Sequence, residues 1–161
     1  MNTNNHIEIE RKYLVRNADY RTLAISRVRI RQGYLSLCAK NSVRVRIWDQ
    51  QAFLTIKSKI GHNGFSRYEW EKEIPVADAE ELLQLAVSGY IDKYRYIVPL
   101  SDGLVCEVDE FMGDNEGLVL AEVELPSENM QFVRPDFLGK EVTLDSHYYN
   151  SYLSLHPFTT W

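Results

Sequence analysis

Ionisable side chains occupy every second position in seven short segments of this chain, and the sign of the charge is largely sorted by segment. The segments are Glu8-Ile9-Glu10-Arg11-Lys12, Arg44-Val45-Arg46, Lys57-Ser58-Lys59, Glu69-Trp70-Glu71-Lys72-Glu73, Lys93-Tyr94-Arg95, Glu107-Val108-Asp109 and Glu122-Val123-Glu124. Alternate residues of a β-strand share one face, and like charges on one face repel. Acidic pairs therefore need metal cations, and basic pairs need an anion with many oxygens. The pattern predicts a sheet that binds a metal-chelated polyphosphate.

The bulk composition narrows the class of protein. A length of 161 residues with 45% apolar residues indicates one globular domain, residues 1–161. No apolar run reaches the roughly 20 residues that cross a bilayer, so no membrane partner is expected. The net charge of −5 argues against a nucleic-acid partner. Cys38 and Cys106 match no metal or redox spacing, and the first residues lack a signal-peptide pattern, so we expect buried, reduced thiols in a cytoplasmic protein.

Strands dominate the predicted secondary structure. Alternation and turn signals predict eight of them, at His6–Val15, Val28–Leu35, Ser42–Trp48, Ala52–Lys59, Arg67–Ile74, Tyr90–Pro99, Leu104–Phe111 and Leu118–Leu125. Turns are expected at Asp49-Gln50-Gln51, Gly61 to Gly64 and Ser101-Asp102-Gly103. Helices are expected at Asp19–Ile25, Ala77–Ser88 and Ser146–Leu155, the last capped by Ser146, with a single turn at Pro135–Gly139.

A mainly β (α+β) fold with eight antiparallel strands favours a closed barrel, because closure removes exposed strand edges. Apolar residues such as Val45, Ile47 and Leu54 have the opposite parity to the charged ones. The barrel must therefore be charged inside and apolar outside, with helices covering part of the exterior. A charged interior is costly unless it is paired or filled by a ligand, and a barrel of about eight strands can hold one small ligand.

At this point the residues resemble a known family, the CYTH superfamily or triphosphate tunnel metalloenzymes. The likeness starts with Glu8-x-Glu10-x-Lys12, continues through the ordered basic and acidic doublets, and runs from Ile7 to Tyr152. Arg31-Gln32-Gly33-Tyr34-Leu35 and the segment from Val142 to Asn150 also look like family sequence. The resemblance implies an eight-stranded antiparallel tunnel that binds a small-molecule triphosphate. The short single-domain bacterial members that this chain resembles are usually triphosphatases.

The basic doublets are the candidate substrate-binding residues. Arginine forks engage phosphate oxygens in pairs, and lysines act as point charges. The positions that resemble the phosphate-binding ones of the family are Lys12, Arg44, Arg46, Lys57, Lys93 and Arg95. Lys59 has the right parity but lies near a strand end, so contact with the ligand and a solvated charge both stay open. Arg29 and Arg31 should face outward, because the resemblance places Gln32 and Tyr34 inside.

The acidic segments are the candidate metal ligands. Carboxylates without a cysteine or histidine cluster select Mg²⁺ or Mn²⁺. The residues that resemble the family's acidic wall are Glu8, Glu10, Glu69, Glu71, Asp109, Glu122 and Glu124, with Glu107 beside them. The alternative is that these acids only pair with nearby bases. For Glu73 a place on the same face and a solvated position at the rim both stay open, and Glu110 has the parity of a surface residue.

Lys12, Glu8, Glu10 and Tyr34 are the candidate catalytic residues. The resemblance gives Lys12 a role near the attacking water, but the sequence does not settle its protonation state. Tyr34 resembles a family tyrosine that can touch this lysine, and plain packing is the alternative. Phosphoryl transfer depends on positioning and electrostatics, so the lack of a covalent nucleophile is no objection.

The leading hypothesis is a metal-dependent triphosphatase that releases orthophosphate from inorganic triphosphate, with nucleoside triphosphates as further substrates. An adenylate cyclase of the class IV type and a thiamine triphosphatase are the enzymatic alternatives, although no pocket for adenine and ribose is evident in the sequence. A phosphoryl-ligand-binding module is the non-enzymatic alternative. The apolar outer face also leaves a homodimer open.

Overall fold

A computed structural model of the protein describes residues 7–38, 40–59 and 66–161. The strands are β1 (Ile7–Val15), β2 (Ser26–Leu37), β3 (Asn41–Trp48), β4 (Gln51–Lys59), β5 (Ser66–Ile74), β6 (Ile91–Pro99), β7 (Val105–Phe111), β8 (Val119–Glu124) and β9 (Leu138–Glu141). The helices are α1 (Tyr20–Leu23), α2 (Val76–Leu83) and α3 (Asn150–Leu153). Short 3₁₀ turns lie at Gly113–Asn115, Ser146–Tyr148 and Phe158–Thr160.

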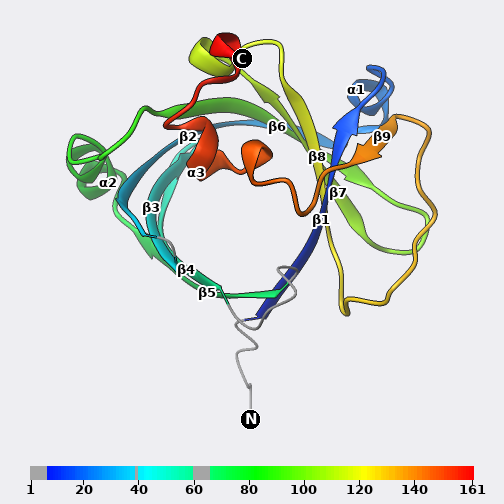
Figure 1. Cartoon of the computed structure of the whole chain (residues 1–161), viewed down its shortest axis with the longest axis horizontal. Coiled ribbons are helices and arrows are strands. Elements are labelled where there is room, and N and C mark those ends of the chain that lie inside the picture. Colours follow the sequence, from blue (N-terminus) through cyan, green and yellow to red (C-terminus); the bar gives the residue numbers. More distant parts are fainter. Residues whose placement is uncertain (1–6, 39, 60–65) are drawn as a thin grey trace.

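The sheet closes on itself, as predicted. Its strands follow the order β5-β4-β3-β2-β6-β7-β8-β1, and β1 pairs with β5 to complete the ring that Figure 1 shows end-on. All pairings are antiparallel. Strand β1 divides its outer edge between two partners. Residues Ile7 to Ile9 face β5, and Tyr13 and Val15 face β9. The eight predicted strands are confirmed, and none of the predicted helices lies inside a strand.

In the C-terminal part of the chain the structure differs from the predicted secondary structure. The predicted turn at Pro135–Gly139 leads into β9, a short strand of four residues that shows no alternation. The predicted helix Ser146–Leu155 is split, because Tyr149 takes an extended backbone conformation between a 3₁₀ turn and α3. Its predicted cap is also wrong. Asp145 caps the first turn by accepting a hydrogen bond from the backbone N–H of His147.

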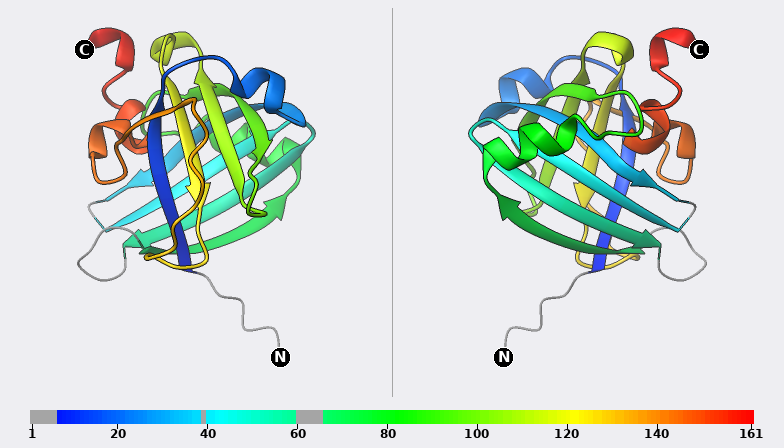
Figure 2. Two further views of the ribbon diagram at one scale, coloured as in Figure 1. Left: turned by 90° about the vertical axis from the view of Figure 1, so that its right-hand side faces the viewer. Right: turned by 90° about the vertical axis from the view of Figure 1, so that its left-hand side faces the viewer.

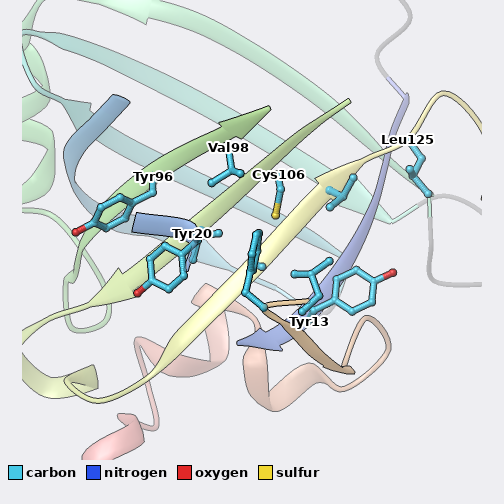
Figure 3. Packing of buried hydrophobic residues seen from close by; sticks show 11 residues of the cluster. Tyr13, Tyr20, Tyr96, Val98, Cys106 and Leu125 are labelled. Atoms are coloured by element: carbon cyan, nitrogen blue, oxygen red, sulfur yellow. The ribbon is translucent and has the colours of Figure 1, made fainter. Parts of the chain in front are cut away.

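The hydrophobic core lies mainly outside the barrel wall. One cluster packs under α2, which covers β2, β3 and β4 in the right-hand view of Figure 2, and includes Val45, Ile47, Ala79 and Leu83. Figure 3 shows a second cluster on the outside of β1 and β6 to β8, built around Tyr13, Tyr20, Val98 and Cys106. In these two clusters the apolar residues of the strands thus face outward, and the charged residues that alternate with them face the interior.

A third cluster fills one end of the barrel. Ile91, Phe111 and Leu120 have the same parity as the charged residues of their strands, and they pack with Val142 and Leu153 of the C-terminal segment. Figures 1 and 2 show this segment, with α3, across that end of the ring. The interior is therefore charged along most of its length and apolar at one end.

The two cysteines differ in their burial. Cys106 is buried as a free thiol, but Cys38 is exposed, so the expectation that both are buried is wrong for Cys38. No helix in the described ranges is long and apolar enough to cross a membrane. The turn expected at Gly61 to Gly64 lies outside the described residues.

Gly33 is required where α2 approaches the sheet. A Cβ atom at this position would lie 3.0 Å from Leu83 Cδ2 and 3.1 Å from Ala86 Cβ. Replacing Gly33 by alanine should lower the free energy of unfolding by about 1–3 kcal/mol, because overpacking displaces the helix. Urea denaturation measures this loss. A Leu83→Ala background removes the nearest of these contacts, so the same substitution should cost clearly less there. Equal losses in both backgrounds would rule out the proposed clash.

Candidate active site

The barrel encloses a cavity of about 270 Å³. Twelve of the residues predicted for the site line it: Glu8, Glu10, Lys12, Tyr34, Arg44, Arg46, Lys57, Glu69, Lys93, Arg95, Glu122 and Glu124. The structure therefore brings together residues from seven strands into one enclosed space. Glu107 also lines the cavity, whereas the predicted residues Glu71 and Asp109 do not.

Opposite charges pair across the interior. Lys57 Nζ lies 2.6 Å from Glu8 Oε2 and 2.6 Å from Glu69 Oε2, which bridges β4 to β1 and β5. Lys12 Nζ lies 2.8 Å from Glu122 Oε1. These contacts pair inward-facing charges of opposite sign. They also mean that a bound phosphate chain and bound cations must exchange partners with groups that are already paired.

Asp109 is an anchor behind the cavity wall. Only 2% of the residue is exposed. Its carboxylate accepts hydrogen bonds from Lys93 Nζ at 2.5 Å and from Arg95 Nε and Nη2 at 2.7 and 2.8 Å. Its parity is the predicted one, but both oxygens are occupied by cations. The geometry fits a residue that positions Lys93 and Arg95 better than one that binds a metal.

The two cations on Asp109 differ in their protonation behaviour. Burial lowers the pKa of Lys93 to about 8, and the nearby Arg95 adds to this effect against the attraction of Asp109. The pKa of Arg95 stays well above its ordinary value, because Asp109 and Glu107 outweigh its burial. Arg95 thus holds the shared carboxylate, and Lys93 is the weaker competitor for it.

Arg44 and Arg46 form the wall opposite β1. Arg46 Nη2 donates to Glu71 Oε2 at 3.1 Å, and the same oxygen accepts from the Thr55 hydroxyl at 2.7 Å. Burial, Arg44 and Arg95 together lower the pKa of Arg46 to about 10. Several cations are thus crowded on one wall, which favours an anionic ligand.

The carboxylates gather on the other side of the cavity. Burial raises the pKa of Glu124, and Glu8, Glu107, Glu69 and Glu10 raise it further by repulsion. A divalent cation among these oxygens would relieve that repulsion, so the donor set fits Mg²⁺ or Mn²⁺. In the described residues no three acidic, histidine or cysteine side chains already converge as a metal site.

Lys12 and Tyr34 lie deep in the cavity, with 3% and 5% exposure. Burial alone would favour the neutral amine of Lys12, but Glu122 and Glu10 reverse this and raise its pKa. Lys12 is therefore a cation in the ligand-free protein. Burial raises the pKa of Tyr34 despite the neighbouring Arg44 and Lys57, so its hydroxyl keeps its proton.

Sequence reasoning missed several lining residues. Arg67 Nη2 contacts Glu10 Oε1 at 3.3 Å, and the Arg67 guanidinium lies over the Tyr149 ring at 4.8 Å. Arg67 lies two residues before Glu69 in the same strand, so alternation places both side chains on one face, and the sequence could have indicated this residue. Asn150 accepts from Lys93 Nζ at 3.5 Å, and the Tyr148 carbonyl accepts from Lys12 Nζ at 3.3 Å. No periodic pattern marks this segment. Ser42, Trp48, Val105 and Ser151 complete the lining.

The outward predictions are confirmed. Arg29 pairs with Asp92 and Arg31 with Glu80 on the exterior. Glu110 accepts from the Tyr20 hydroxyl and from Arg21 on the same side. Lys59 is exposed at the end of β4 and lines a second cavity beside the tunnel, and Glu73 is exposed.

Comparison with known proteins agrees with this geometry. The CYTH domain model matches residues 6–155. An inorganic triphosphatase of Acetivibrio thermocellus is 46% identical over 152 residues, which cover 94% of this chain and 95% of that protein. An inorganic triphosphatase of Nitrosomonas europaea is 38% identical, with 92% and 97% covered.

Solved structures show the same fold. The crystal structure of the inorganic triphosphatase NE1496 is 34% identical, covers 92% of this chain and 94% of its own, and has a TM-score of 0.64. A protein from Hippeastrum described as a putative adenylyl cyclase with a dominant triphosphatase activity is 17% identical, with 74% and 80% covered and a TM-score of 0.58. At that identity the likeness concerns the fold alone.

The role of Asp109 can be tested on stability. Asp109→Asn removes the carboxylate that Lys93 and Arg95 share and leaves Arg95 only Glu107 and Glu122, so the free energy of unfolding should fall by about 3–5 kcal/mol. Urea denaturation without ligands measures this. The matched control is Glu80→Gln, which removes a carboxylate from an arginine at the surface and should cost less than about 1 kcal/mol. Similar losses for the two variants would contradict the anchoring role.

Lys93 should give a pH signature. Its pKa of about 8 in the folded protein compares with 10.5 for an ordinary lysine. As pH rises, the folded protein releases this proton first, so the free energy of unfolding should rise in the wild type relative to Lys93→Met between these two values. Nitrogen NMR of the lysine ammonium group provides a direct check. A Lys93 signal that titrates together with the surface lysines would contradict the expectation.

Proposed function

Because the chain belongs to the CYTH domain family, we propose that it is an inorganic triphosphatase that hydrolyses a terminal phosphoanhydride bond and releases orthophosphate, in a reaction that requires Mg²⁺ or Mn²⁺. The observation that carries the proposal is the enclosed cavity, in which arginines and lysines of β3, β4 and β6 face carboxylates of β1 and β8. A small anion with many oxygens and accompanying cations match these two walls.

Substrate binding follows from the basic wall. Arg44, Arg46 and Arg95 offer guanidinium edges to the phosphoryl oxygens, and Lys57 and Lys93 add compact charges. Lys57 would move its contact from Glu8 and Glu69 to the phosphate chain, which frees these carboxylates. They would then hold the divalent cation together with Glu10, Glu122 and Glu124. A cation bound there supplies positive charge to the phosphoryl oxygens and acidifies water.

Rate enhancement then depends on fixed positive charge. The transition state of phosphoryl transfer spreads negative charge over the equatorial oxygens. Buried, preorganised cations stabilise this charge without reorganisation. Because Lys12 is protonated beside Glu122, we assign it to this electrostatic role rather than to proton abstraction from water. Tyr34, with its proton retained, can donate a hydrogen bond to a phosphoryl oxygen.

Nucleoside triphosphates are a second substrate class, which a specific feature favours. A cavity of about 310 Å³ adjoins the tunnel and shares Lys57, Arg67 and Tyr149 with it. Leu37, Tyr152 and Leu155 give this second cavity apolar surfaces. The sequence indicated no space for an organic group, and this second cavity supports the proposal of one. We therefore propose weaker hydrolysis of nucleoside triphosphates.

A homodimer stays a prediction. Ile7, Ile56 and Tyr68 are exposed on the outer side of β1, β4 and β5. This apolar strip is consistent with a contact between copies of the chain.

The activity is tested by incubating the protein with inorganic triphosphate or ATP and with Mg²⁺, Mn²⁺ or a chelator. We expect orthophosphate from both substrates, more from inorganic triphosphate, and none with the chelator. Lys12→Ala should lower kcat by about 100-fold or more while changing substrate affinity less, because its charge acts most strongly in the transition state. Glu80→Gln, at the surface, is the control. Pyrophosphate release from ATP, or turnover with the chelator, would contradict the proposal.

A further inference from the structure

Gln32 is a buried amide without a partner. Only 1% of the residue is exposed, and neither its amide nitrogen nor its amide oxygen has a hydrogen-bond partner in the described part of the chain. Burying such a group costs free energy, and native proteins rarely tolerate it. An apolar residue of the same length would serve the ligand-free fold better. Stability of the fold alone therefore does not explain why a glutamine occupies this position.

The register of the sheet locates this side chain. Gln32 shares the inward parity of β2 with Tyr34, and it lies directly across from Arg46 on β3. Its neighbour on the other side is Ile91 of β6, which belongs to the apolar cluster at the end of the barrel. Tyr34 and Arg46 line the cavity but Gln32 does not. Gln32 thus lies behind the lining and can act only through a lining residue.

Arg46 has the complementary deficiency. Its Nε atom is buried and unpartnered among the described residues, as is the Nε atom of Arg44. The Nη2 atom of Arg46 donates to Glu71, a carboxylate outside the cavity lining. An acceptor without a donor therefore stands across from a donor without an acceptor. Each would satisfy the other if the guanidinium group turned away from Glu71.

We propose that Gln32 is a positioning residue for Arg46: when a triphosphate enters the tunnel, Arg46 leaves Glu71, its Nε donates to the Gln32 amide oxygen, and its two terminal nitrogens face the phosphoryl oxygens. This inference rests on the proposed function, because the triphosphate supplies the acceptors that draw the guanidinium group inward. A bidentate contact needs a fixed guanidinium plane, and a hydrogen bond at Nε fixes it. The Gln32 amide oxygen thus accepts a hydrogen bond only when triphosphate is bound, and it lowers the stability of the protein without triphosphate.

Gln32→Met tests the proposal first on stability. Methionine keeps the length and removes both polar atoms, so the ligand-free variant should have a higher melting temperature than the wild type. Asn115→Leu is the control. Asn115 is also 1% exposed, but its Oδ1 accepts from the backbone N–H of Phe158 at 2.8 Å, and it does not line the cavity. Its melting temperature should fall. A fall for Gln32→Met as well would show that the amide is already satisfied, and would overturn the proposal.

The second test couples Gln32 to Arg46. Gln32→Met should weaken triphosphate binding without metal by about tenfold, equivalent to about 1.4 kcal/mol in calorimetry, and should raise KM with a much smaller change in kcat. Arg46→Lys removes the Nε donor, so Gln32→Met should have no further effect on binding in that background. A tenfold loss in both backgrounds would overturn the proposal.

The outcomes distinguish this inference from the proposed function. A wild-type protein that binds triphosphate but releases no orthophosphate contradicts the proposed function, while the binding cycle still decides the role of Gln32. A wild-type protein that does not bind triphosphate overturns both. Gln32→Glu provides an additional check, because a carboxylate would hold Arg46 permanently, so its affinity for triphosphate should fall below that of Gln32→Met.

Discussion

Pairing of opposite charges across the barrel interior is the constraint on which this structure depends. Inward-facing lysines and arginines of one strand meet carboxylates of another, as Lys57 does between Glu8 and Glu69. Buried ion pairs add little net stability, because desolvation offsets their attraction. The free energy that holds the barrel closed must therefore come from the apolar clusters on its outer side. Stability and chemistry are separated onto the two faces of one sheet.

The same ion pairs determine how the site can bind a ligand. Each cation that is expected to hold a phosphate already has a carboxylate partner, and the carboxylates that are expected to hold a metal, apart from Glu124, already contact a cation. Binding is thus an exchange of partners and not the first satisfaction of isolated charges. Asp109 differs, since its two oxygens are enclosed behind Lys93 and Arg95 and take no part in such an exchange. Gln32 differs in the opposite way, because it has no partner to give up.

The sequence predicted most of the barrel and the site because both follow from a period of two. Parity placed Glu122, Arg44 and Lys93 on one face, and closure brought that face together. Parity gives the side of the sheet but not the position relative to the cavity lining, so Asp109, which is buried behind it, and Glu71, which is exposed, were both grouped with the metal ligands. The contacts of Asn150 and Tyr148 depend on how the C-terminal segment folds back across the barrel, which no periodic pattern encodes. Strand β9 is too short for alternation to appear.

The double pairing of β1 has a consequence for folding. Its first residues join β5 through Ile7 and Tyr68, which are far apart in the chain, while its last residues join β9. Contacts between distant residues form slowly, since a long loop must close first. Glu8 meets Lys57 across this junction. The strand junction that completes the ring therefore also positions one of the ion pairs of the cavity wall.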